Sequence, residues 1–123
     1  DYIARENKKI GEYDYYVMHQ ANQYILQQLS KRVKLDPKKM LYSIQDYGNT
    51  SSASVPLTLC KYFGKEEEGE VSVLMSGFGV GLSCGVMSTC LNKKDIFPII
   101  ESDDYFKEGI INGPEDWQLE REG

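Results

Sequence analysis

The stretch Gly48-Asn49-Thr50-Ser51-Ser52-Ala53-Ser54-Val55-Pro56 is a run of small and hydroxylated residues between a strand-like segment and a helix-like one. Gly48 permits a tight turn or a positive φ, and Asn49 offers both a carbonyl acceptor and an amide donor. The threonine and serines that follow can satisfy the free N–H groups that open a helix. The run therefore predicts a polar side chain fixed at a strand end, although a well-capped entry into a helix would have the same composition.

The segments on either side of this run predict the elements that hold it. In residues 40–45, one face would carry Met40, Tyr42 and Ile44 and the other Leu41, Ser43 and Gln45. This alternation predicts a strand. The helix predicted next includes the apolar residues Leu57, Leu59, Cys60 and Phe63. Pro56 is tolerated because it falls near the first turn, and Gly64 is a good C-terminal stop.

Another strand and helix precede them. The segment 13–18, with the apolar run 15–18, predicts a short buried strand that ends at His19. Open α/β sheets usually bind ligands at the carboxyl ends of their strands. From Asn22 onward one apolar stripe of helical period predicts an amphipathic helix, with Ile25, Leu26, Leu29 and Val33 on the stripe. The segment 35–37 ends this helix, because the residue before a proline disfavours the α conformation.

Two apolar segments, 71–76 and 82–91, predict two central strands. The glycine-rich link Gly77-Phe78-Gly79-Val80-Gly81 between them suits an antiparallel pair joined by a wide turn. The predicted order is βαβαββ, an α/β fold with a mixed sheet of about four strands and flanking helices.

Three of these stretches together carry a resemblance. His19-Gln20-Ala21-Asn22, Gly48-Asn49-Thr50-Ser51 and Gly77-Phe78-Gly79-Val80-Gly81 occur in the order and at the spacing of the β-ketoacyl-acyl-carrier-protein synthase III family, within the thiolase-like condensing enzymes. The chain resembles the C-terminal half of that family over about 13–91. Each motif is weak alone, but the three in this order are jointly specific.

The resemblance implies that residues 1–94 form most of one thiolase-like half, truncated at its N-terminus. Asp1–Ile10 then corresponds to the end of a longer helix that Gly11 stops. The family's reactive cysteine lies in the N-terminal half, so the missing half is an expected partner and this chain alone is expected to be inactive. Such a fragment leaves a sheet edge and an apolar helix face uncovered, which predicts a homo-oligomer.

Charge separates the two ends of the chain. Residues 1–94 hold 12 Lys/Arg and 10 Asp/Glu, whereas residues 95–123 hold 2 and 9. The segment 95–123 is therefore predicted to be an acidic C-terminal extension, partly disordered by composition, or a docking segment with Trp117 as its anchor. The net charge of -5 argues against nucleic-acid binding.

Length, apolar runs and the cysteine and histidine content limit the classes of protein to which the chain can belong. The sequence has 123 residues, enough for one domain with a real core. It lacks a run of about 18 apolar residues and does not begin with a signal-like segment, so a cytoplasmic protein without membrane insertion is predicted. Cys60, Cys84 and Cys90 show no disulfide or zinc spacing and are predicted to be buried small hydrophobes. One histidine excludes a His-rich metal site, and no metal is expected.

The family joins an acyl group held as a cysteine thioester to malonyl-acyl carrier protein, with loss of carbon dioxide. Acyl-coenzyme A and malonyl-acyl carrier protein are its substrates in fatty acid biosynthesis, and no cofactor is implied. By motif, His19 and Asn49 match the family's catalytic His and Asn, which donate hydrogen bonds to the developing enolate. The nitrogen of His19 that faces the substrate must then carry the proton, and its neighbours would set that tautomer. Without the motif, a lone histidine at a strand end would be a satisfied core residue.

The resemblance also implies residues that bind the substrate or the carrier protein. The backbone N–H of Val80 matches a second oxyanion-hole donor, while Gly79 and Gly81 allow a close backbone approach. Asn22 matches a position near the pantetheine arm. Lys31 and Arg32 match basic residues that dock the acidic acyl carrier protein, although exposed basic side chains are common on any helix.

Three residues depart from the family pattern. Val80 stands where the family often has glycine, which leaves the backbone donor but narrows the pocket. Tyr24 stands where the family often has an arginine that helps hold the carrier or coenzyme A, which weakens the docking inference. Cys84 replaces a bulky residue and has no neighbouring base in the sequence, so it is not predicted to be the nucleophile.

The resulting prediction is a 3-oxoacyl-[acyl-carrier-protein] synthase III-like acyltransferase whose Cys-His-Asn site is completed by another segment. Two alternatives remain open. One is a secondary-metabolism acyltransferase of the same superfamily, and the other is a non-catalytic half that only pairs with a partner.

Overall fold

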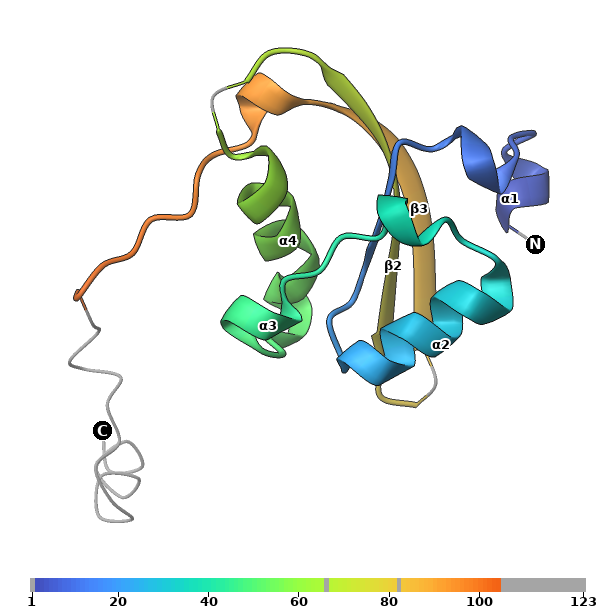
Figure 1. Ribbon diagram of the computed structural model, residues 1–123, viewed down its shortest axis with the longest axis horizontal. Coiled ribbons are helices and arrows are strands. Elements are labelled where there is room, and N and C mark those ends of the chain that lie inside the picture. The colour runs from blue at the N-terminus through green and yellow to red at the C-terminus, as the bar shows by residue number, and fades with distance from the viewer. Residues whose placement is uncertain (1, 66, 82, 105–123) are drawn as a thin grey trace, which may run out of the picture.

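A mixed sheet of three strands carries the fold in the computed structural model, which describes residues 2–65, 67–81 and 83–104 (Figure 1). The strands are β1 (Tyr15–Met18), β2 (Glu70–Gly79) and β3 (Ser83–Asn92), in the order β1-β2-β3. β1 pairs with β2 in parallel, from Tyr15 opposite Val73 to Met18 opposite Ser76. β2 pairs with β3 antiparallel, which confirms the predicted pair across the glycine-rich link.

Two helices, α2 (Gln23–Val33) and α4 (Ser54–Phe63), cover opposite faces of this sheet (Figure 1). Leu26 of α2 packs in one core cluster with Leu74 of β2, whereas Phe63 of α4 packs in the other with Val73. Because Val73 and Leu74 are neighbours in one strand, their side chains point to opposite faces. The result is a three-layer arrangement, which confirms the predicted α/β fold with a mixed sheet and flanking helices.

Short elements complete the described chain. There are two one-turn helices, α1 (Tyr2–Arg5) and α3 (Ile44–Tyr47). Four 3₁₀ turns lie at Ile10–Glu12, Pro37–Lys39, Ser51–Ala53 and Lys93–Asp95. No helix in the described ranges is both long enough and apolar enough to cross a membrane.

The strand predicted over 40–45 is wrong in detail. Only Met40 forms an isolated parallel bridge, to Tyr16, and α3 begins at Ile44. Side chains replace the missing ladder, because Gln20 Oε1 accepts the N–H of Ser43 at 2.9 Å and that of Ile44 at 3.2 Å. These side-chain bonds, together with the Leu41 N–H that donates to the Tyr16 carbonyl at 3.1 Å, dock the segment beside β1. The sheet has three strands instead of about four.

Two further predictions need correction at β3. This strand is an edge strand and not a central one, and most of its residues are exposed. Cys84 and Cys90 lie on it and are exposed, whereas Cys60 in α4 is half-buried, so the prediction of three buried cysteines is wrong. The apolar composition of β3 would suit a central strand, but in the described chain β2 is its only neighbour.

Helix α2 begins where predicted, with Asn22 as its N-cap, and it ends at Lys34 in the left-handed conformation (φ 57°). Its apolar stripe is narrower than predicted, because Leu26 is buried while Ile25 and Val33 are 51% and 44% exposed. At α4 the expected capping is also wrong, since the N-cap position is Ala53 and the side chain of Ser54 bonds elsewhere.

The start of the acidic extension contacts the domain. Ile96 packs against the core cluster on the α4 side. The backbone of Phe97 and Pro98 lies so close to Gly64 that a Cβ there would have no room. Trp117 and the rest of 105–123 lie outside the described residues, so the boundary at 94/95 and the disorder of the extension stay predictions.

Candidate active site

His19 lies directly after β1, at the carboxyl end of the strand, and is half-buried. Its backbone N–H extends the β1–β2 ladder by donating to the Ser76 carbonyl at 2.8 Å. Its ring has two neighbours: Nδ1 lies 2.8 Å from Ser54 Oγ, and the ring meets that of Phe78 edge-on at 5.9 Å between centroids. The imidazole is thus held between the start of α4 and the end of β2.

Gln20 fixes the backbone around His19. Its side chain is fully buried, and Nε2 donates to the carbonyls of Met18 at 2.8 Å and Leu41 at 3.4 Å, while Oε1 accepts the two N–H groups that open the α3 turn. A buried amide that satisfies four backbone groups ties the end of β1 to the segment before Asn49. Sequence reasoning assigned Gln20 no role; a polar side chain following a fully apolar strand was the available sign.

Ser54 contacts His19 Nδ1 and can thereby set which nitrogen of the imidazole carries the proton. Its side chain is 1% exposed, and its oxygen already accepts the backbone N–H of Gln20 at 3.3 Å. The hydroxyl hydrogen then needs an acceptor, and among the described hydrogen bonds His19 Nδ1 is the remaining partner. Donation to Nδ1 places the imidazole proton on Nε2, because a neutral imidazole has one donor and one acceptor nitrogen.

Asn49 follows α3 in an exposed loop after Gly48, whose φ is +69°. Its Oδ1 accepts the backbone N–H of Ser51 at 2.9 Å, which forms a local turn of the kind that asparagine favours. This bond orients the side-chain amide and leaves the Nδ2 donors without a partner among the described hydrogen bonds.

Val80 lies at the tip of the β2–β3 turn and is fully exposed. Its carbonyl accepts the Ser83 hydroxyl at 3.2 Å. Gly81 has a φ of +80°, a conformation that glycine adopts without strain, and a Cβ on Gly79 would lie 2.8 Å from Ser83 Oγ. The turn therefore presents backbone groups, as the glycine-rich sequence predicts.

The remaining predicted binding residues lie on α2. Asn22 uses Oδ1 to cap the helix, accepting the N–H of Tyr24 at 2.8 Å and of Ile25 at 3.4 Å. Lys31 and Arg32 are exposed in the last turn. Within the part of the chain that the structure describes, no hydrogen bond joins His19, Asn49 and Val80 to one another; Ser54 and Gln20 connect the segments that carry the first two.

The geometry and the motif spacing have a counterpart in known proteins. Residues 3–89 match the family described as 3-Oxoacyl-[acyl-carrier-protein (ACP)] synthase III C terminal. The chain belongs to this family. A curated relative, the beta-ketoacyl-[acyl-carrier-protein] synthase III of Microcystis aeruginosa, is 43% identical over 85 residues, which are 68% of this chain and 25% of the relative. That of Gloeobacter violaceus is 47% identical over 74 residues, 58% of this chain and 22% of the relative.

Solved structures agree with this membership in the synthase III family. A 3-oxoacyl-(acyl-carrier protein) synthase from Burkholderia xenovorans superposes with a TM-score of 0.69 at 32% identity, over 79% of this chain and 28% of that one. The synthase III from Aquifex aeolicus gives 0.61 at 33% identity, over 70% and 28%. These likenesses confirm the thiolase-like α/β fold. The chain spans about a quarter of the length of the curated relatives it matches.

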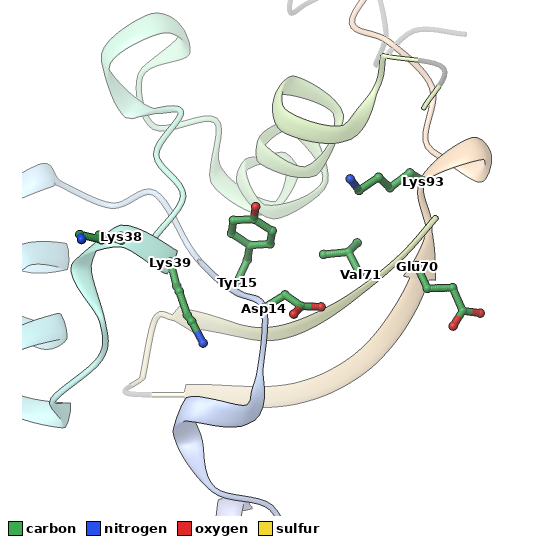
Figure 2. A pocket seen from close by; sticks show the side chains of 7 residues that line it. All are labelled: Asp14, Tyr15, Lys38, Lys39, Glu70, Val71 and Lys93. Atoms are coloured by element: carbon green, nitrogen blue, oxygen red, sulfur yellow. The ribbon is translucent and has the colours of Figure 1, made fainter. Parts of the chain in front are cut away.

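At the end of the sheet opposite His19, the chain has a charged hollow of about 460 Å³ (Figure 2). It lies where β1 and β2 begin and β3 ends. The residues that line it are Asp14, Tyr15, Lys38, Lys39, Glu70, Val71 and Lys93.

The lysines of this hollow are partly engaged in the fold. Lys39 Nζ donates to the carbonyls of Gly11 and Tyr13, both at 2.9 Å, and thereby fastens the segment before β1. Lys93 forms an ion pair of 3.5 Å with Glu67. With Asp14 and Glu70 also at its wall, the hollow is mixed in charge and separate from the His19 end of the sheet.

Two tyrosines near β1 have shifted acidities. Burial, and secondarily the Asp36 carboxylate, raises the pKa of Tyr16, whose hydroxyl donates to the Ile10 carbonyl at 2.7 Å. Burial, followed by the neighbouring Tyr62, raises the pKa of Tyr42. Both phenols are therefore neutral at physiological pH.

Proposed function

We propose that this chain supplies the His and Asn of a Cys-His-Asn site in a 3-oxoacyl-[acyl-carrier-protein] synthase III-like acyltransferase of fatty acid biosynthesis. The observation that carries the proposal is the Ser54 contact on His19 Nδ1, because donation from the Ser54 hydroxyl to Nδ1 would leave Nε2 as an N–H donor for the substrate.

The reaction consumes a malonyl thioester and an acyl-cysteine thioester. Breaking the carboxylate C–C bond of the malonyl group releases carbon dioxide and leaves the electron pair as an enolate, whose charge lies on the thioester oxygen. His19 Nε2–H and the Asn49 amide would donate to that oxygen. Preorganised donors of this kind are each worth about 10² to 10³ in rate.

The second half of the reaction forms the new bond. The enolate carbon attacks the carbonyl of the acyl-cysteine, and the tetrahedral oxyanion collapses with release of the cysteine thiolate. The Val80 N–H is the donor that we assign to this oxyanion. Its location in a turn with positive φ at Gly81 and no side chain at Gly79 supports a close approach by the thioester.

The substrates would be acyl-coenzyme A and malonyl-acyl carrier protein, and the chemistry needs no cofactor. Asn22 would bind near the pantetheine arm, and Gly79 and Gly81 would allow the backbone to approach the substrate closely. Lys31 and Arg32, exposed on the last turn of α2, would dock the acidic carrier protein. We also propose that the nucleophilic cysteine comes from the missing N-terminal half. The assembly would be a cytoplasmic homo-oligomer. The chain by itself would not catalyse the condensation.

A chimaera tests this proposal. In this chimaera, residues 3–89 would replace the matching segment of the Microcystis aeruginosa synthase. The other three quarters of the chimaera would be the sequence of that synthase. We expect malonyl-carrier decarboxylation and condensation, and we expect His19→Ala or Asn49→Ala to lower the decarboxylation rate by about 10²-fold or more. Gln27→Ala, an exposed change on α2, is the matched control and should leave the rate unchanged.

Two results would contradict the proposal. Unchanged decarboxylation in a folded His19→Ala chimaera would mean that the motif serves the structure and that the chain is a non-catalytic partner half. Turnover of acyl-coenzyme A and malonyl carrier protein by the 123-residue chain alone would overturn the predicted dependence on a second segment. Analysis of the chimaera's products, as ester or amide against 3-oxoacyl chain, tests the alternative of a secondary-metabolism acyltransferase.

A further inference from the structure

Helix α4 contacts the segments of both proposed donors through side chains on one of its faces. These side chains are spaced four and three residues apart, which places them on the same side of a helix, and they belong to Ser54, Thr58 and Lys61. Ser54, in the first turn, contacts the His19 ring. The other two contact the segment 42–46, which leads to Asn49. One helix therefore connects the two segments on which the donors lie.

Thr58 forms a buried contact of this face. Its side chain is 0% exposed, and its hydroxyl donates to the Ser54 carbonyl one turn earlier at 2.7 Å. Since that bond uses the Thr58 hydrogen, the Ser43 hydroxyl is the donor in the 2.7 Å contact between Ser43 Oγ and Thr58 Oγ1. The Ser43 carbonyl in turn accepts the backbone N–H groups of Asp46 and Tyr47. Thr58 thus fixes the residue at which the α3 turn starts.

Lys61 contacts two parts of the same segment. Its Nζ donates to the Tyr42 carbonyl at 2.9 Å, before α3, and forms an ion pair with Asp46 Oδ2, within α3. The neighbouring Tyr62 hydroxyl also bonds the backbone of Tyr42, whose N–H it accepts at 3.3 Å. The ammonium group of Lys61 therefore ties the one-turn helix to the last turn of α4.

The position of Asn49 depends on where α3 lies. This turn closes with the Gly48 N–H on the Ile44 carbonyl at 2.9 Å, and Asn49 follows Gly48 directly. Among the described hydrogen bonds, the Asn49 side chain has one partner, the Ser51 N–H of its own loop. That bond orients the amide within the loop but does not place the loop against His19. A shift of α3 on α4 would therefore move the Asn49 amide, and a displacement of about 1 Å can cost about 10² in rate.

The ion pair is too exposed to contribute much to stability. The side chains of Lys61 and Asp46 are 30% and 51% exposed, and solvent screening and the loss of side-chain freedom weaken such pairs. Removing the pair should therefore barely change the free energy of unfolding. It can still change the position of α3, because a helix of one turn has little stability of its own.

We propose that Lys61 is a positioning residue for the synthase reaction: through its ion pair with Asp46 it fixes α3 and thereby sets the Asn49 amide relative to His19 Nε2. Thr58 fixes the start of α3, and Lys61 fixes its body. This role rests on the proposed catalytic function of Asn49, because Lys61 acts on the rate through that amide.

A double-mutant cycle in the chimaera with the Microcystis aeruginosa synthase tests this role. Lys61→Met removes the ammonium group and keeps the alkyl stem. We expect kcat for malonyl decarboxylation to fall about tenfold with KM unchanged, because a misplaced donor weakens transition-state stabilisation and not substrate binding. In an Asn49→Ala background the same change should cost less than about twofold, since the group through which Lys61 acts is absent. An equal loss in both backgrounds would contradict the positioning role.

Three further variants separate the ion pair from other effects. Lys61→Arg retains a cation that can donate to Asp46 and should keep the rate within about twofold of the parent chimaera. Asp46→Ala removes the acceptor and should lower kcat as Lys61→Met does, again only while Asn49 is present. Lys65→Met changes an exposed lysine just beyond α4, and as the matched control it should leave the rate unchanged. If Asp46→Ala left kcat unchanged, the ion pair would not be what positions α3.

Hydrogen exchange in the 123-residue chain gives a readout that needs no catalysis. The Gly48 N–H, which is bonded to the Ile44 carbonyl, reports the opening of α3, and NMR measures its exchange. We expect exchange at least about fivefold faster in Lys61→Met, with unchanged exchange in the β2–β3 ladder. Unchanged Gly48 exchange would overturn the positioning role. An undiminished decarboxylation rate in the Asn49→Ala chimaera would instead overturn the proposed function, so the two failures are distinguishable.

Discussion

The two parts of the chain that would stabilise negative charge are held in opposite ways. The His19 corner, which we define as residues 18–20 together with Ser54, is fixed by buried side chains, with Gln20 and Ser54 at 0% and 1% exposure. The glycine turn, residues 79–81, is exposed at its tip, and one hydroxyl, that of Ser83, reaches its Val80 carbonyl.

The difference follows from the type of donor. A side-chain donor such as imidazole can rotate and change tautomer, so it needs a partner on the opposite nitrogen and a rigid backbone. A backbone N–H is aimed by φ and ψ alone, so a turn with a glycine at positive φ suffices. The comparison predicts that the His19 corner depends on polar side chains and the glycine turn on conformation.

The largest expected effect comes from Gln20→Ala. The change removes both amide atoms from a fully buried site and leaves the N–H groups of Ser43 and Ile44 and the carbonyl of Leu41 without their partner. Because buried unsatisfied groups cost about 1–3 kcal/mol each, partly recovered by relaxation, we expect a loss of about 3 kcal/mol in the free energy of unfolding.

Urea denaturation followed by circular dichroism measures this loss. Gln27→Ala on the exposed side of α2 is the matched change and should alter the free energy by less than about 0.5 kcal/mol. A loss below about 1 kcal/mol for Gln20→Ala would show that the corner is not organised by this side chain.

Ser54→Ala should have the next largest effect. It removes the hydroxyl that accepts the Gln20 N–H and contacts His19 Nδ1, and we expect a loss of about 2 kcal/mol. Without the donor on Nδ1, the ring should exchange between both neutral tautomers. Nitrogen-15 shifts of the imidazole measure that population, with exposed Ser52→Ala as the control. An unchanged Nε2–H population in Ser54→Ala would contradict the tautomer assignment.

Local patterns predicted most of the fold. The apolar run before His19, the helix after Asn22 and the antiparallel strands around the glycine-rich link all have strong periodicity or turn chemistry, and all three are observed. The position of His19 at a strand end also followed from local sequence, whereas Asn49 was predicted at the end of a strand and follows the helix α3 instead. The features that were predicted correctly need only neighbouring residues to specify them.

Features that depend on distant partners could not be predicted in this way. The alternation in 40–45 suited a strand, but Gln20, about twenty residues away, bonds the backbone of Ser43 and Ile44 and lets α3 begin. The exposure of Cys84 and Cys90 depends on β3 being at the sheet edge, which composition does not encode. The role of Ser54 likewise required the distance to His19.

The smallest expected effects test the glycine turn itself. Gly81→Ala adds a Cβ in open space but at a φ of +80°, so the cost of about 1 kcal/mol is purely conformational. Gly77→Ala in β2 also meets nothing within 4 Å, yet it lies outside the positive-φ region. It should therefore be neutral or slightly stabilising, since alanine loses less backbone entropy on folding. Urea denaturation of the two variants should give changes of opposite sign or clearly different size. Equal changes would mean that the backbone conformation of Gly81 is not what holds the turn, and the Ser83 hydroxyl would then have to be the restraint.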